Sequence, residues 1–179
     1  MGFDVHGLNP KINQSMNDYE TLSKYRDMDF GDRMKAFDKD DSIRKKYYDE
    51  LDKYENSNIG IYFRNNVWFW RPLWAFVCDN CNDILSARQM TLGNSNDGVE
   101  IEDEEAVAIH DRIMIDIGEE QILKMHAEYE QMRQEAKENN KGKKLGDEGY
   151  NWEASYPFDA DNVIRFAKFC KESGGFTIC

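Results

Sequence analysis

Residues 59–74 read Ile-Gly-Ile-Tyr-Phe-Arg-Asn-Asn-Val-Trp-Phe-Trp-Arg-Pro-Leu-Trp, and this stretch is expected to anchor the core. The apolar and aromatic residues of 59–64 predict a strand. Asn65-Asn66 is a turn signal, because asparagine side chains hydrogen-bond to nearby backbone. Residues 67–70 are then expected to form a second short strand or a tight aromatic corner.

A helix is predicted to begin at Arg71-Pro72, because proline fits the first turn of a helix, and to extend to about Ala87. Residues 91–99 are rich in Gly, Asn and Ser, which predicts a loop. The acidic residues of 100–105 then predict the start of another helix, where negative charge suits the helix dipole.

The two ends of the chain add further elements. Residues 2–6 alternate weakly and predict a strand, and two amphipathic helices are predicted around 30–38 and 41–54. Residues 119–138 are rich in strong helix formers and predict a helix, followed by a flexible, polar loop over 139–149. Beyond this loop, Asp159 or Asp161 is expected to cap a last helix, and residues 176–179 are expected to return as an edge strand.

Together these segments predict an α+β fold. We expect a mainly helical single domain over residues 1–179, with a small sheet formed by N-terminal, central and C-terminal strands. A length of 179 residues fits one domain that buries a core without disulfides or metals.

The formal net charge of -12 restricts the partners of this chain. An acidic protein repels nucleic acid phosphates as a whole, so no direct DNA or RNA binding is expected, and any nucleotide contact requires a local basic patch. The charge also fits an acidic surface that imitates DNA and occupies a basic protein. The sequence shows no secretory signal and no apolar stretch long enough to span a membrane, so we expect a cytoplasmic protein without membrane contact.

The four cysteines do not predict a metal site or a cofactor. Cys78 and Cys81 form a Cys-x-x-Cys pair on an expected helix, while Cys170 and Cys179 are distant and loosely spaced. A zinc ribbon requires two close pairs or nearby histidines. The interpretation is therefore of reduced, buried thiols, with neither a structural metal nor a cofactor.

The densest chemistry lies in the aromatic-arginine segment 62–74, where three of the four tryptophans fall within seven residues. Aromatic faces stack on bases, and arginine binds phosphate, so the segment predicts a nucleotide site. An aromatic core corner with ion-paired arginines is the favoured alternative. We expect at least one tryptophan to lie outside the core and to line a pocket with Arg64 or Arg71. The candidate ligand-binding residues are Tyr62, Arg64, Asn66, Trp68, Trp70, Arg71 and Trp74.

No catalytic residues are predicted. His110-Asp111 could provide a general base with an orienting carboxylate, but neighbouring residues on one helix rarely face each other, so a solvated or partly buried pair is expected instead. The chain has no phosphate-binding glycine loop, no nucleophile elbow and no zinc-protease motif.

Four segments carry a resemblance to a known group. Residues 60–74, the loop 96–98 and the ending 173–179, together with the opening 1–7, resemble a group of small uncharacterised proteins from bacteriophages and bacteria. The resemblance transfers no activity and no catalytic residue. What it implies is a setting, namely a phage-encoded protein that acts inside a bacterium.

In that setting we expect a non-enzymatic binding protein that sequesters a small phosphorylated nucleotide signal of host defence. Such a sponge requires stacking surfaces and charge-assisted hydrogen bonds but no nucleophile. A homo-oligomer is expected, because an interface between copies can bury the ligand. The alternatives are an acidic inhibitor of a host protein, acting through residues such as 102–105, and an enzyme that cleaves the nucleotide signal.

Overall fold

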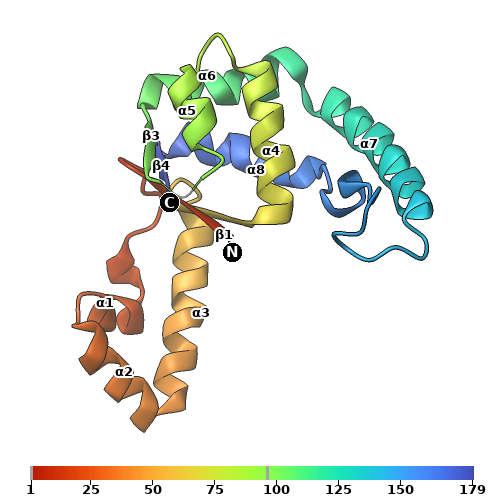
Figure 1. Ribbon diagram of the computed structural model, residues 1–179. Helices are drawn as coiled ribbons and strands as arrows, with labels where there is room; N and C mark the ends of the chain where they lie inside the picture. Colours follow the sequence, from red (N-terminus) through yellow and green to blue (C-terminus); the bar gives the residue numbers. More distant parts are fainter. Residues whose placement is uncertain (1, 96) are drawn as a thin grey trace.

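The structure is a computed structural model that describes residues 2–95 and 97–179; Met1 and Asn96, which belong to the opening and loop motifs quoted above, lie outside the described residues. Its centre is an antiparallel sheet with the strand order β2-β1-β4-β3. Helices pack around this sheet (Figure 1), so the predicted mainly helical α+β fold with N-terminal, central and C-terminal strands is confirmed. The strands are β1 (Gly2–Gly7), β2 (Tyr62–Asn66), β3 (Val99–Ile101) and β4 (Phe176–Ile178).

Strand β4 is an interior strand, which corrects the prediction of an edge strand at 176–179. Ile178 pairs with Val5 of β1 on one side and with Val99 of β3 on the other. Strand β3 was not predicted, because its first residue was assigned to the loop 91–99 and the other two to the acidic helix start at 100–105. The outer strands of the described sheet are therefore β2 and β3.

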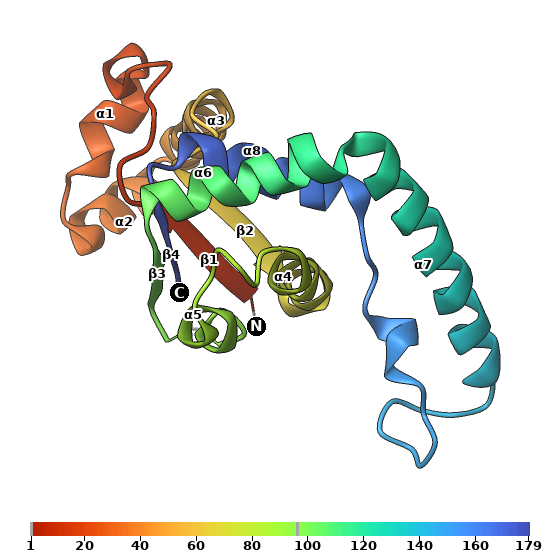
Figure 2. The ribbon, with the colours of Figure 1, turned by 90° about the horizontal axis from the view of Figure 1, so that it is seen from above.

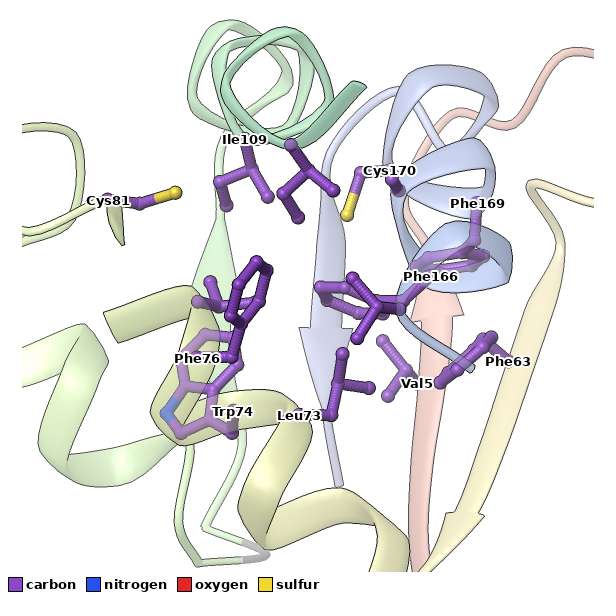
Figure 3. Close-up of a cluster of buried hydrophobic side chains, with 14 of the residues drawn as sticks. Val5, Phe63, Leu73, Trp74, Phe76, Cys81, Ile109, Phe166, Phe169 and Cys170 are labelled. Atoms are coloured by element: carbon purple, nitrogen blue, oxygen red, sulfur yellow. The ribbon is translucent and has the colours of Figure 1, made fainter. Parts of the chain in front are cut away.

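One face of the sheet is apolar and the other is polar, as side-chain alternation along strands requires. Val5 pairs with Phe63, and both side chains are buried. Their neighbours Asp4 and Arg64 also pair, and these alternate with the buried positions. Helices cover the apolar face (Figure 3), where the side chains of α4, α6 and α8 meet those of the strands.

The core is built largely from aromatic rings on α8 (Ala160–Glu172) and α4 (Val67–Asn80). Phe166 contacts Phe63 edge-on at 5.3 Å between ring centroids and Trp70 at 5.8 Å, so it joins β2 to α4. Ile109 of α6 (Asp103–Asp111) is fully buried in the same cluster. The i, i+3, i+4 spacing on the last helix thus gives the buried face that was predicted.

Helix α4 begins four residues earlier than predicted. The Asn66 side chain accepts hydrogen bonds from the backbone N–H groups of Trp68 (3.0 Å) and Phe69 (3.2 Å), so Asn66 is a helix N-cap rather than part of a turn. Residues 67–70 are accordingly the first turn of the helix and neither a strand nor a corner. The helix also ends at Asn80 rather than near 87, and a separate short helix follows, α5 (Ala87–Leu92).

The N-terminal helices form an arm that extends from the sheet (Figure 1). They are α1 (Glu20–Arg26), α2 (Phe30–Lys39) and α3 (Asp41–Ser57), preceded by the short helix η1 (Met16–Asp18). This arm has its own hydrophobic cluster, in which Phe37 lies between Tyr25 and Tyr47. The helices predicted around 30–38 and 41–54 are therefore present as α2 and α3.

A second extension continues from the end of α6 and lies on the side away from β3 and β4 (Figure 2). Helix α6 continues into the π-helical segment η2 (Arg112–Ile117), and Gly118 then turns the chain with a φ of 81° into α7 (Glu119–Asn139). A loop leads to the short helix η3 (Trp152–Ser155), which packs back on α7. The flexibility of the loop 139–149 remains a prediction. In the described ranges, no helix combines the length and apolar character needed to cross a membrane.

Candidate functional site

The structure separates the seven predicted site residues into four groups. Trp70 and Trp74 belong to the core: both have an exposed fraction of 0%, and their rings stack at 5.5 Å. Their indole N–H groups donate to the backbone carbonyls of Gly93 (2.7 Å) and Met90 (3.0 Å). The core alternative therefore holds for these two tryptophans, and neither can contact a ligand at the surface.

Trp68 lies outside the core, as expected of at least one tryptophan. Its side chain is 36% exposed and contacts the Tyr156 ring at 5.1 Å. The Arg71 guanidinium donates to the Tyr156 hydroxyl at 3.0 Å. The hollow beside Arg71, however, is lined by Tyr156, Trp152 and other residues and not by Trp68.

The Asn66 side chain caps helix α4 and is therefore not free to bind a ligand. Replacing Asn66 by Ala is expected to lower the free energy of unfolding by about 1 kcal/mol, because the first N–H groups of α4 lose their acceptor. Chemical denaturation followed by circular dichroism measures this loss. Asn65→Ala is the matched control, since the Asn65 side chain caps no helix and donates to Asn162 instead. A loss for Asn66→Ala no larger than that for the control would contradict the capping role.

Tyr62 and Arg64 lie on a different surface, which we name the β2-edge groove. The groove forms where the edge strand β2 meets α8 and the end of α3, and its volume is about 290 Å³. Its lining residues are Glu55, Asn56, Ile59, Tyr62, Phe63, Arg64, Arg165, Lys168 and Phe169.

The β2-edge groove is locally basic. Arg165 and Lys168 lie one turn apart on α8, both are exposed, and neither forms an ion pair within the described part of the chain. The Arg165 guanidinium lies 5.6 Å from the centre of the Phe63 ring, a cation–π contact that positions it at the groove. The Arg64 guanidinium is 3.5 Å from the Asp4 carboxylate, but its side chain is 67% exposed. Three cations therefore converge on one hollow.

Glu55 is the acidic residue of the groove. Burial raises the pKa of its carboxyl, an effect that nearby Arg26 opposes and Asp52 reinforces. A raised pKa means that the surroundings disfavour the charged form, so the carboxylate is poorly solvated where it lies. The charge balance of the lining still favours an anion, with three cations against one acid.

Tyr62 is held by a network on the polar face of the sheet. Its hydroxyl donates a short hydrogen bond to the Asp4 carboxylate, and its ring contacts His6 at 5.1 Å. Burial, followed by the hydrogen bond to Asp4, raises the pKa of Tyr62 to about 12. The phenol is therefore protonated at neutral pH and is a fixed surface rather than an acid or base.

A second hollow, the α4/α7 groove, is larger and mainly apolar. It lies between helices α4 and α7, with a volume of about 400 Å³. Its lining residues are Pro72, Ala75, Phe76, Asp79, Asn80, Met125, Glu128, Tyr129, Met132 and Phe158. The adjoining hollow at Arg71 shares Pro72 and Tyr129 with it.

Cys78, Cys81 and Cys170 are poor candidates for a nucleophile, whereas Cys179 is exposed. Burial raises the pKa of Cys78 and of Cys81 to about 11, and that of Cys170 well above its usual value. Thiols with such pKa values are almost wholly protonated at neutral pH, and the thiolate is the reactive form. In the ranges 2–95 and 97–179, no group of three or more His, Cys, Asp or Glu side chains is placed to hold a metal ion.

The histidines also take part in local contacts. His110 Nδ1 and the Asp111 carboxylate are 2.9 Å apart, so these neighbours do face each other and form a partly buried pair, one of the two expected arrangements. The His110 side chain is largely buried in α6, so the pair does not open onto either groove. His126 Nδ1 accepts the backbone N–H of Ala160 at 3.2 Å at the start of α8.

Arg165 and Lys168 were not predicted as site residues. Their i, i+3 spacing on the outer side of an amphipathic helix can be recognised in the sequence. Such a pair, however, most often lies on a solvent-exposed helix face without a binding role. Comparisons with protein families, curated proteins and solved structures give no match to this chain. The structure therefore shows a mainly helical α+β fold whose described surface includes the basic β2-edge groove and the apolar α4/α7 groove.

Proposed function

We propose that the protein binds a small phosphorylated nucleotide in the β2-edge groove and holds it without converting it. The observation that carries this proposal is the convergence of Arg64, Arg165 and Lys168 in a chain of net charge -12. Arginine offers a planar fork that matches phosphate, and lysine adds a point charge. A local basic groove is what an otherwise acidic chain requires to attract a phosphate.

The same groove offers a surface for the base. Tyr62, Phe63 and Ile59 contribute aromatic and apolar lining beside the cations. Aromatic faces stack on bases of any sequence, and the fixed Tyr62 ring loses little conformational freedom on binding. The volume of about 290 Å³ is at the lower end of the range for ligand pockets, so it fits one nucleoside phosphate unit. A larger ligand would extend beyond the groove, where a second copy of the chain would cover it; we therefore also propose a homo-oligomer.

Binding without conversion fits the chemistry of the lining. The Tyr62 hydroxyl is committed to Asp4, and the buried thiols with raised pKa values lie elsewhere in the fold. The proposed role is that of a sponge for a nucleotide signal in the cytoplasm of a phage-infected bacterium. This setting rests on the resemblance of the chain to phage and bacterial proteins.

The acidic alternative finds less support at residues 102–105. The Glu105 carboxylate already accepts the backbone N–H of Glu102 at 2.9 Å and the side-chain amide of Gln89 at 2.7 Å. It therefore closes the capping box of α6 and joins α5 to it. Neutralising it would disturb the helix start as well as the surface charge.

The test is isothermal titration against a panel of cyclic dinucleotides and ADP-ribose derivatives. Arg165→Ala and Lys168→Ala are each expected to weaken binding by about 1.5–3 kcal/mol, the range for a lost charged hydrogen bond, with the fold retained. Arg44→Ala and Lys45→Ala, near the start of α3 and outside the groove lining, are the matched controls and are expected to bind like the parent. Arg71→Ala is also expected to have little effect, because its guanidinium lies against Tyr156.

Other results of these measurements would contradict the proposed site or the proposed role. If no nucleotide of the panel binds, or if the two groove variants bind like the controls, the β2-edge groove is not a nucleotide site. Chromatography of the ligand after incubation separates binding from turnover. A chemically altered ligand would show that the protein is an enzyme, in conflict with the proposed sponge.

A further inference from the structure

The α4/α7 groove has an apolar floor contributed by two helices. Phe76 of α4 and Tyr129 of α7 both contact the Phe158 ring, at 5.4 and 5.9 Å between ring centroids. Met125 and Met132 line the α7 side. Figure 2 shows the segment that leads into α8 running between α4 and α7, and Phe158 of this segment lines the groove together with residues of both helices.

Large apolar side chains remain exposed along this surface. Met132 is 53% exposed, and Trp152, which lines the adjoining hollow, is 46% exposed. Because the two hollows share Pro72 and Tyr129, the apolar surface continues from α7 to η3. Methionine adapts its shape to different partners and is frequent on binding surfaces. A continuous exposed patch of this kind marks an interaction site.

The charges at the rim are negative. Asp79 and Glu128 line the α4/α7 groove and Glu153 lines the adjoining hollow. All three are exposed, and none forms an ion pair within residues 2–95 and 97–179. The one cation in the two linings is Arg71, which donates to the neutral Tyr156 hydroxyl, so the linings carry three acids against one cation. This rim repels phosphate and favours lysine or arginine on whatever binds.

We propose that the α4/α7 groove binds a basic amphipathic helix of a partner protein. Helices lie in apolar grooves between other helices, with their apolar face inward. The lysines and arginines at the edge of that face would meet Asp79, Glu128 and Glu153. A second copy of this chain fits less well, because it carries the same acidic rim and a net charge of -12.

The test uses a synthetic 18-residue peptide of leucine and lysine, with the leucines placed on one helical face. A peptide of the same composition with the leucines scattered around the helix is the first control. We expect the full chain to bind the amphipathic peptide at least about tenfold more tightly than the scattered one, because only the former presents a continuous apolar face. Binding is expected to weaken as salt rises, since part of the attraction is between charges at the surface.

Two matched variants on α7 locate the site. Met132→Arg places a cation and bulk in the groove and is expected to weaken peptide binding about tenfold or more. Leu123→Arg, at an equally exposed apolar position outside the lining, is expected to bind the peptide like the parent. Methyl signals of Met125 and Met132 in an NMR titration should shift, while that of Met34 in the N-terminal arm should not.

Three outcomes would overturn the inference. The amphipathic and scattered peptides could bind equally, or Met132→Arg could behave like Leu123→Arg. Alternatively, sedimentation could show that the parent chain is a dimer. If Met132→Arg dissociated this dimer and Leu123→Arg did not, the occupant of the groove would be a second copy. Lys168→Ala is expected to leave peptide binding unchanged, so the result is independent of the nucleotide proposal.

Discussion

Replacing Trp70 by Ala is expected to lower the free energy of unfolding by about 3–5 kcal/mol, the range for removing a large buried aromatic side chain. The Trp70 ring is fully buried between Trp74 and Phe3, with ring centroids 5.5 and 5.1 Å away. Its removal leaves a cavity and also leaves the Gly93 carbonyl without the indole N–H. Urea denaturation followed by far-ultraviolet circular dichroism measures the loss without relying on tryptophan fluorescence.

Trp68→Ala is the matched control, because it removes the same side chain two residues away. Trp68 is 36% exposed and contacts mainly Tyr156, so its loss is expected to cost about 1 kcal/mol or less. Equal losses for the two variants would contradict the placement of Trp70 in the core. If Trp70→Ala abolished nucleotide binding with the stability unchanged, Trp70 would be a ligand residue, as the sequence alone had suggested.

Much of the fold was predictable because several elements carry local signals. The strand near Val5 alternates, and α8 shows the apolar spacing of a buried face after the Asp159 cap. The start of α4 was missed because asparagine is common both in turns and at helix N-caps. Asn66 was read as a turn, and Pro72 as a first-turn proline, although Pro72 lies inside the helix. Strand β3 has three residues, too few for a periodicity to be recognised.

The aromatic-arginine segment 62–74 divides between the core and the surface because residues 67–74 belong to helix α4. The sequence had predicted that this helix begins only at Arg71. In an α-helix, residues four apart share a face, so Trp70 and Trp74 point together into the core. Trp68 and Arg71 are three apart and share the opposite, exposed side, where both reach Tyr156. Seven residues that are neighbours in sequence therefore cannot converge on one ligand.

The composition of the β2-edge groove depends on tertiary packing. Tyr62 and Arg64 are two apart on a strand and were identified from the sequence, but Arg165 and Lys168 come from a helix about 100 residues later in the chain. Their placement follows from the packing of Phe166 and Phe169 against Phe63. No local pattern encodes which strand a helix will cover, so this half of the groove required the structure.

Asn58 links the two ends of the N-terminal arm, and its loss is expected to be the second largest effect. The side chain is fully buried at the end of α3. Its Oδ1 accepts the backbone N–H groups of Asn13 (2.7 Å) and Gln14 (3.0 Å), and its Nδ2 donates to the carbonyls of Gln14 (3.0 Å) and Tyr54 (2.8 Å). One amide thus satisfies backbone groups of two segments that are far apart in the sequence, residues 13–14 and Tyr54.

Asn58→Ala is expected to lower the free energy of unfolding by about 2–4 kcal/mol, because each buried backbone group left unpaired costs about 1–3 kcal/mol. The loss should appear first in the arm, whose separate hydrophobic cluster would lose its connection to residues 13–14. Hydrogen exchange should therefore rise in α1 and α3 well before it rises in α8. Asn13→Ala removes only one exposed hydrogen bond, to the Ser57 carbonyl, and should change exchange little. Uniform exchange across α1, α3 and α8 in Asn58→Ala would show instead that the arm and the sheet unfold as one cooperative unit.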